Sequence, residues 1–115
     1  MTFQPDSSLE QDEVDDIVDD TIAENEVVLF MKGNELMPQC GYSQRALELI
    51  GQYREDLETV DTLESLPEFR EALAAHSGWE TIPQTFVDGE FVGGSDVLAE
   101  LEERGELEGT LQAEG

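Results

Sequence analysis

The hydrophobic residues of this chain recur with the periods of helices and strands. In residues 11–25 they fall at Val14, Ile17, Val18 and Ile22, and acidic residues fill most of the positions between them. This i, i+3, i+4, i+8 spacing predicts an N-terminal amphipathic helix that buries one stripe and exposes an acidic face.

The next pattern is an unbroken hydrophobic run, Val27–Met31, which is typical of a fully buried strand. A polar loop follows and ends at Cys40. Hydrophobic positions then return with helical spacing up to Gly51, and Gly41 and Ser43 stand where that helix would begin. We therefore expect Cys40 to precede or open a helix.

A strand and a helix are predicted in the middle of the chain. The strand is Leu57–Val60. The helix begins at Ser65, which can cap it, has Pro67 in its first turn and Glu68 to complete a capping box, and runs towards Ser77.

A hairpin and a last helix complete the pattern. Strand residues 84–87 and 90–92 flank Asp88-Gly89, a pair typical of a two-residue turn with positive φ. The last helix follows Gly94-Ser95, and the acidic chain past Gly105 is expected to be frayed.

These elements predict an α/β fold. A strand joined to the next strand through a helix implies a parallel pair, and the hairpin adds antiparallel strands. The expected architecture is a four-stranded mixed sheet flanked by helices on both faces, with an extra N-terminal helix. We expect a disordered N-terminus at residues 1–10, one domain over residues 11–105 and an acidic C-terminal tail at residues 106–115.

Charge limits the partners of this domain. The 115 residues include 29 Asp and Glu but only 5 Lys and Arg, for a formal net charge of −24. A protein that binds phosphates needs cations on one face, so neither nucleic acid nor an anionic membrane is expected as a partner. Because concentrated salt screens such repulsion, the composition favours a halophilic protein over an ordinary acidic protein with a disordered tail.

The single cysteine, Cys40, excludes an internal disulfide and a four-ligand zinc site within one chain. No hydrophobic run approaches the roughly 20 residues that a membrane-spanning helix needs. The acidic start of the chain lacks the features of a signal peptide, so the expected location is cytoplasmic.

Cys40 is the candidate reactive residue. A thiol becomes a thiolate more readily at a helix N-terminus or beside a cation. The backbone N–H groups of the first helical turn would face the sulfur, Lys32 ends the strand that leads into the loop, and Arg45 lies one turn into the helix. The alternative is a buried, inert cysteine.

Four segments, in this order, carry a resemblance to a known family: Met31-Lys32-Gly33, Cys40-Gly41-Tyr42-Ser43, Trp79 to Gln84, and Val87 to Asp96. Together they resemble the monothiol glutaredoxins of the thioredoxin-like superfamily, over about Val14 to Arg104. The resemblance implies a thioredoxin-like fold, a bound glutathione beside the cysteine, and a [2Fe–2S] cluster held by Cys40 between two subunits.

The resemblance also implies how the thiol is held. Lys32 and Arg70 would pair with its glycine carboxylate, the backbone of Ile82 before a cis Pro83 would bind its cysteinyl part, and Ser95 and Asp96 would hold its γ-glutamyl group. The remaining contacts are expected at Gly41, Tyr42, Thr81 and Gly94. If the cell uses γ-glutamylcysteine instead of glutathione, the glycine carboxylate is missing.

Three residues depart from the family pattern. Tyr42 replaces the usual Phe, Glu80 stands where Pro is common, and Ser95 stands where many members have a second cysteine. Elsewhere, His76 is expected to be a solvated residue near a helix end, and Trp79 to serve packing rather than chemistry.

Three functions follow. The first is transfer of a [2Fe–2S] cluster, which needs four thiolates and therefore two chains and two small thiols, in a homodimer that is a monomer without the cluster. Iron–sulfur acceptor or assembly proteins would be its partners. The second is glutathione-dependent thiol–disulfide exchange by Cys40 alone. The third is a thioredoxin-fold interaction module with an idle cysteine.

Overall fold

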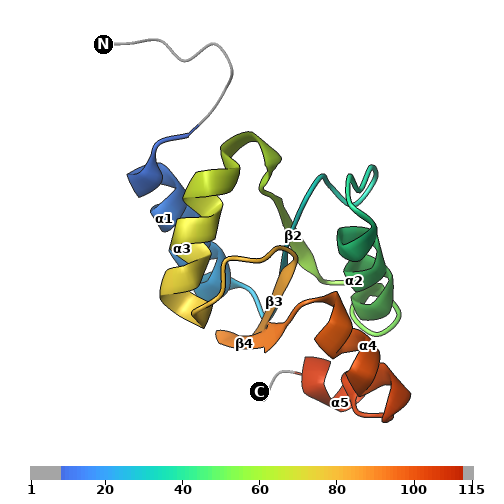
Figure 1. Ribbon diagram of the computed structural model, residues 1–115. Coiled ribbons are helices and arrows are strands. Elements are labelled where there is room, and N and C mark those ends of the chain that lie inside the picture. Colours follow the sequence, from blue (N-terminus) through green and yellow to red (C-terminus); the bar gives the residue numbers. More distant parts are fainter. Residues whose placement is uncertain (1–8, 113–115) are drawn as a thin grey trace.

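The computed structural model describes residues 9–112, and over them the chain folds as a three-layer α/β structure (Figure 1). The elements in chain order are α1 (Gln11–Glu24), β1 (Val27–Met31), α2 (Gly41–Gly51), β2 (Glu58–Asp61), a 3₁₀ turn (Leu63–Ser65), α3 (Leu66–Ser77), β3 (Gln84–Val87), β4 (Glu90–Gly93), α4 (Ser95–Glu103) and α5 (Leu107–Leu111). The four strands form one mixed sheet in the order β2-β1-β3-β4. The pair β1–β2 is parallel, and β1–β3 and β3–β4 are antiparallel, which confirms the predicted sheet and the thioredoxin-like fold.

The central strand β1 separates two hydrophobic clusters because successive side chains of a strand point to opposite faces. Val28 and Phe30 join a cluster under α1 and α3, whereas Val27, Leu29 and Met31 join a cluster under α2, α4 and α5. All five residues are buried, as the unbroken hydrophobic run predicts. Helices thus cover both faces of the sheet, with α1 as the additional N-terminal helix (Figure 1).

The hairpin between β3 and β4 turns where the sequence predicts. Asp88 and Gly89 have φ values of 52° and 84°, the left-handed region that a two-residue turn of this kind requires. The register of the pair shifts between Thr85 and Phe86, so the two strands are not a regular ladder.

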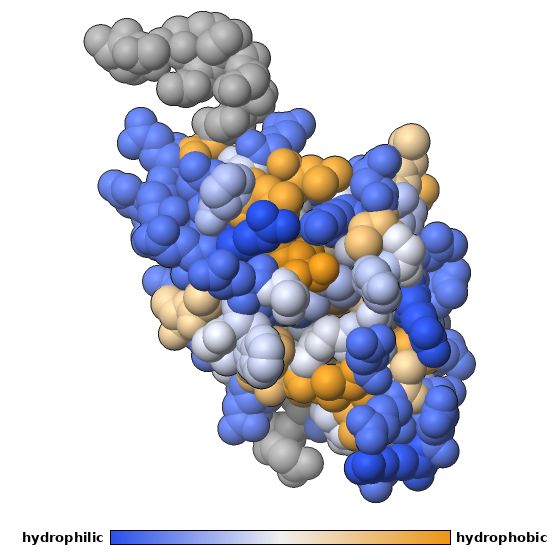
Figure 2. All heavy atoms as spheres, in the orientation of Figure 1, coloured by the Kyte–Doolittle hydropathy of each residue, from blue (hydrophilic) through white to orange (hydrophobic). Residues whose placement is uncertain are grey.

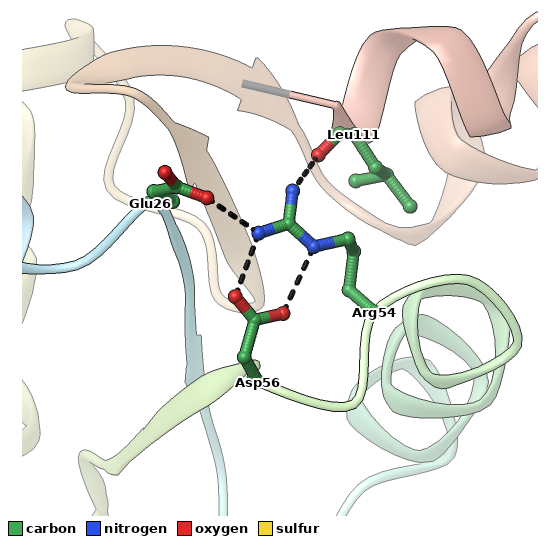
Figure 3. A network of polar contacts seen from close by, with 4 residues as sticks. All are labelled: Glu26, Arg54, Asp56 and Leu111. Carbon is green, nitrogen blue, oxygen red and sulfur yellow. Dashed lines mark hydrogen bonds and ion pairs between the residues drawn. The ribbon is translucent and has the colours of Figure 1, made fainter. Parts of the chain in front are cut away.

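The C-terminal segment corrects the expectation of a frayed acidic tail. Residues Leu107–Leu111 form α5, and Leu107 and Leu111 are fully buried against the α2 and α4 side of the sheet. Arg54 fixes this helix, since its guanidinium donates to the carbonyl oxygen of Leu111 at 2.6 Å and to carboxylates of Glu26 and Asp56 at 2.7 Å (Figure 3).

The N-terminal boundary and one helix cap also differ from the expectation. Leu9 packs against the core and donates its N–H to the hydroxyl oxygen of Ser65 at 2.8 Å, so residues 9 and 10 belong to the ordered domain. The Ser65 hydroxyl forms no capping bond to α3, so the predicted capping box with Glu68 is wrong. Residues 1–8 of the expected disordered segment lie outside the described residues.

Polar and acidic side chains dominate the surface. In the view of Figure 2, hydrophilic residues cover the flanks, and paler and hydrophobic residues gather between them. Within residues 9–112, no helix combines the length and the hydrophobicity that crossing a bilayer demands.

Candidate functional site

Cys40 lies at the N-terminus of α2, as the sequence predicts. It is the residue just before the helix, with an extended backbone, and its carbonyl oxygen accepts the first helical hydrogen bond from Gln44 N–H at 2.9 Å. Ala46 and Ile50 bury the opposite side of α2 and fix the helix on the sheet. The thiol is free and partly exposed, so it is accessible to a ligand.

The surroundings of Cys40 favour its thiolate. Burial raises the pKa of the Cys40 thiol, but hydrogen bonds from the backbone N–H groups of Ser43 and Tyr42, a hydrogen bond from the Ser43 hydroxyl and the charge of Lys32 together bring that pKa below its usual value. The Ser43 hydroxyl oxygen also accepts the backbone N–H of Lys32 at 3.0 Å, which joins the end of β1 to the site.

Two expectations about the groups that favour the Cys40 thiolate are corrected in part. Gly41 opens α2, but the backbone groups that lower the pKa of Cys40 are those of Tyr42 and Ser43. Arg45 is exposed and is not among the groups that shift this pKa, so Lys32 is the cation that acts on the sulfur.

The loop between β1 and α2 is tightly constrained. Gly33 has a φ of 89°, and a Cβ atom there would lie 2.5 Å from the carbonyl oxygen of Met37. Gln39 N–H donates to the Lys32 carbonyl at 2.9 Å, and Gly33 N–H donates to the Asp61 carboxylate at 3.0 Å. The loop therefore holds Cys40 in place while its tip leaves Leu36 and Met37 exposed.

Cys40 opens onto a cavity of about 640 Å³. This volume lies within the range of small-ligand sites, roughly 300–1,000 Å³. The cavity brings together ten of the eleven predicted site residues: Lys32, Cys40, Tyr42, Arg70, Thr81, Ile82, Pro83, Gly94, Ser95 and Asp96. The predicted residue that does not line it is Gly41.

Helices α3 and α4 and the segment before β3 supply part of the walls of this cavity. Arg70 comes from α3, and Ser95 and Asp96 from the first turn of α4, whose N-terminus attracts negative charge. Between them runs segment 79–83, in which the Ile82–Pro83 bond is cis, as the family resemblance implies. The site thus carries cationic groups and a carboxylate around one thiol.

Sequence reasoning missed part of the wall. Trp79 is expected to serve packing, yet the residue is 60% exposed and lines the cavity. Val97 is exposed on the same cavity, and Phe91 and Val92 line it from β4. Trp79 stands inside one of the segments that carry the resemblance, and this position could have indicated that it lines the site. The contact of the Ser43 hydroxyl with Cys40 depends on the helix geometry and has no such signal.

Two other features of residues 9–112 lack this chemistry. A smaller, polar cavity of about 360 Å³ lies beside Tyr53 and Arg54 but contains no cysteine or histidine. His76 is exposed in the last turn of α3, as expected, and its Nε2 lies 2.7 Å from the Asp19 carboxylate while its ring packs edge-on against Phe86. In the same part of the chain, no group of three or more His, Cys, Asp or Glu side chains is placed to hold a metal ion.

Comparison with known proteins gives one consistent result. The family model of glutaredoxin matches residues 27–92. An uncharacterized monothiol glutaredoxin, ycf64, of Porphyra purpurea is 42% identical over 84% of this chain and 89% of its own length. A ycf64-like monothiol glutaredoxin of Synechocystis is 43% identical over 83% of this chain and 88% of its own. The solution structure of reduced poplar apo GrxS14 has a TM-score of 0.72, with 38% identity, and covers 84% of this chain and 87% of that one.

Proposed function

This chain belongs to the glutaredoxin family, and from that premise we propose that it binds a small thiol beside Cys40 and carries a [2Fe–2S] cluster between two subunits. The observation that carries the proposal is the open cavity in which a thiolate-favouring cysteine faces charged groups of both signs. Iron–sulfur acceptor or assembly proteins would receive the cluster.

Glutathione matches the charges of the cavity. It has two carboxylates and one ammonium group, and the cavity presents Lys32, Arg70 and the N-terminus of α4 together with the carboxylate of Asp96. Lys32 and Arg70 would hold the glycine carboxylate, and Asp96 the ammonium of the γ-glutamyl group. The backbone of Ile82 would pair with the cysteinyl part as a strand edge does. γ-Glutamylcysteine would make the same contacts except those to a glycine carboxylate.

The cluster requires ligands from more than one chain. A [2Fe–2S] cluster takes four thiolates, and this chain has one cysteine. Two copies of Cys40 and two molecules of the small thiol complete the set, so the protein would be a homodimer with the cluster and a monomer without it. Because half of the ligands are exchangeable, such a cluster would be transferable, which supports a role as a carrier.

A second function is supported by the lowered pKa of Cys40. The Cys40 thiolate would attack the glutathione sulfur of a protein–glutathione disulfide, form a Cys40–glutathione disulfide and release the protein thiolate. A second glutathione thiolate would then attack that intermediate, restore the Cys40 thiolate and leave as oxidised glutathione. The same lowered pKa, with the open cavity, argues against the third function, an interaction module with an idle cysteine.

Anaerobic reconstitution tests the proposal. The protein is incubated with iron and sulfide, with and without glutathione, and its visible absorbance and molar mass are measured, with Cys40→Ser as the control. Colour and a dimer that depend on both glutathione and Cys40 are expected. A colourless monomer with high disulfide reductase activity would favour the second function, glutathione-dependent thiol–disulfide exchange. A parallel reconstitution with γ-glutamylcysteine, which lacks the glycine carboxylate, tests whether Lys32 and Arg70 recognise that carboxylate of glutathione.

We also propose that the protein works in the cytoplasm of a cell with a high internal salt concentration. The support is compositional: a formal net charge of −24 over 115 residues is tolerated best where salt screens repulsion between acidic side chains. We further propose that the chain forms a single glutaredoxin domain. Because α5 is part of it, this domain extends to at least residue 111.

A further inference from the structure

Gln84 lies behind the wall of the cavity rather than in it. It is the first residue of β3, and its side chain is completely buried. Its Nε2 donates to the carbonyl oxygen of Trp79 at 2.7 Å and to that of Thr81 at 2.9 Å. Both acceptors belong to segment 79–83, so one buried amide holds the backbone of that wall at two points.

The amide of Gln84 has no second role in the core. Its Oε1 is buried and has no hydrogen-bond partner among residues 9–112. A buried polar atom without a partner is unfavourable, and a hydrophobic side chain of similar size would avoid it. The two bonds donated to the wall are therefore what the buried amide contributes.

Segment 79–83 needs these bonds because it has no regular secondary structure of its own. Trp79 is held from both sides: its N–H donates to the Ser77 hydroxyl oxygen at 3.0 Å, and its carbonyl accepts from Gln84. Trp79 as a residue meanwhile stays 60% exposed and lines the cavity. The backbone of the wall is thus fixed, while its side chains remain available to a ligand.

We propose that Gln84 is a positioning residue that sets the affinity of the site for its small thiol. It acts through the backbone of Trp79 and Thr81, and so on Ile82, which follows them and offers its backbone to the ligand. This inference rests on the proposed binding of a thiol beside Cys40. Gln84 does not line the cavity and is not among the groups that shift the pKa of Cys40, so it acts on binding rather than on the reactivity of the sulfur.

Gln84→Met tests this, because it keeps the size of the side chain and removes both donated bonds. The affinity of the reduced protein for glutathione, measured by calorimetry, is expected to fall roughly tenfold. In the thiol-free protein the fluorescence of Trp79, the single tryptophan, is expected to become easier to quench with acrylamide. The pH profile of Cys40 alkylation is expected to stay unchanged. A general loss of structure would change this profile, so the measurement separates the two effects.

Thr85→Val is the matched control. Thr85 is the next residue of β3, is fully buried, and its hydroxyl also has no partner among the residues that the structure describes. Its replacement removes a buried polar group without touching segment 79–83, so affinity and quenching should match those of the wild type. Should Gln84→Met fail to fold, Gln84→Asn takes its place, since it keeps the amide but is one methylene too short to reach both carbonyls.

The outcomes separate this inference from the proposed function. Wild-type protein that does not bind glutathione refutes thiol binding, and Trp79 quenching in the variants then decides alone whether Gln84 holds the wall. If Gln84→Met binds glutathione with the same affinity as the wild type and its Trp79 is quenched to the same extent, the inference is overturned. An equal loss of affinity in Thr85→Val also overturns it, because the effect would then belong to β3 as a whole.

Discussion

Ser43→Ala is expected to slow the chemistry of Cys40 without closing its site. The Ser43 side chain is fully buried, and its hydroxyl hydrogen-bonds the sulfur and accepts the N–H of Lys32 at 3.0 Å. In the variant the thiolate keeps the two backbone donors of Tyr42 and position 43 but loses the hydroxyl. One such bond contributes about 1 kcal/mol, which corresponds to about a fivefold smaller thiolate population below the pKa.

The assay is the rate of alkylation by iodoacetamide across a pH series. Cys40 is the single cysteine, so every modified molecule reports on it. The wild type has a lowered thiol pKa, and the loss of a donor to the thiolate raises it again. The variant should therefore react about fivefold more slowly at low pH and equally fast at high pH, where all the thiol is ionised. Equal rates throughout would refute the role of the hydroxyl, and a deficit that persists at high pH would show blocked access instead.

Three further predictions concern stability, each measured by chemical or thermal unfolding. Gly33→Ala should lower the free energy of unfolding by about 2 kcal/mol or more, because position 33 has a φ of 89° and its Cβ would meet the Met37 carbonyl oxygen at 2.5 Å; an unchanged midpoint would contradict this. Arg54→Met should lower the free energy of unfolding by about 2 kcal/mol and expose α5 to proteolysis, since Arg54 binds the Leu111 carbonyl and two carboxylates. A C-terminus that stays protected from proteolysis would be inconsistent with that role. For the wild type, the unfolding midpoint should rise with potassium chloride concentration, and a salt-independent midpoint would remove the basis for a halophilic origin.

Much of the fold follows from hydrophobic periodicity because burial on a sheet constrains the pattern strongly. Val27–Met31 is a short hydrophobic run typical of a strand buried on both faces, and the turn at Asp88 and Gly89 needs residues that tolerate positive φ. The short helix α5 escapes this reasoning. It has five residues, and its two buried leucines stand among acidic and polar neighbours, so local pattern does not distinguish it from a solvated tail.

The site shows the same division between local and tertiary information. A cysteine before a helix is readable from the sequence because the helix pattern begins just after it. That the Ser65 hydroxyl accepts the N–H of Leu9, 56 positions away, and forms no capping bond to α3 is set by tertiary packing. The bonds from Gln84 to Trp79 and Thr81 span few residues, but they depend on the path of an irregular segment that periodicity does not describe.

The acidic surface and the thiolate act against each other, and salt separates the two effects. A net charge of −24 disfavours one more anion, whereas Lys32 and the hydrogen bonds to Cys40 favour it. Screening in concentrated salt weakens the distant charges but leaves short hydrogen bonds intact. In Lys32→Met the favourable charge is absent, so raising potassium chloride should speed alkylation of Cys40 by neutral iodoacetamide at low pH. A rate that does not change with salt in this variant would mean that the acidic surface does not act on the sulfur, and that hydrogen bonding at the start of α2 sets its ionisation.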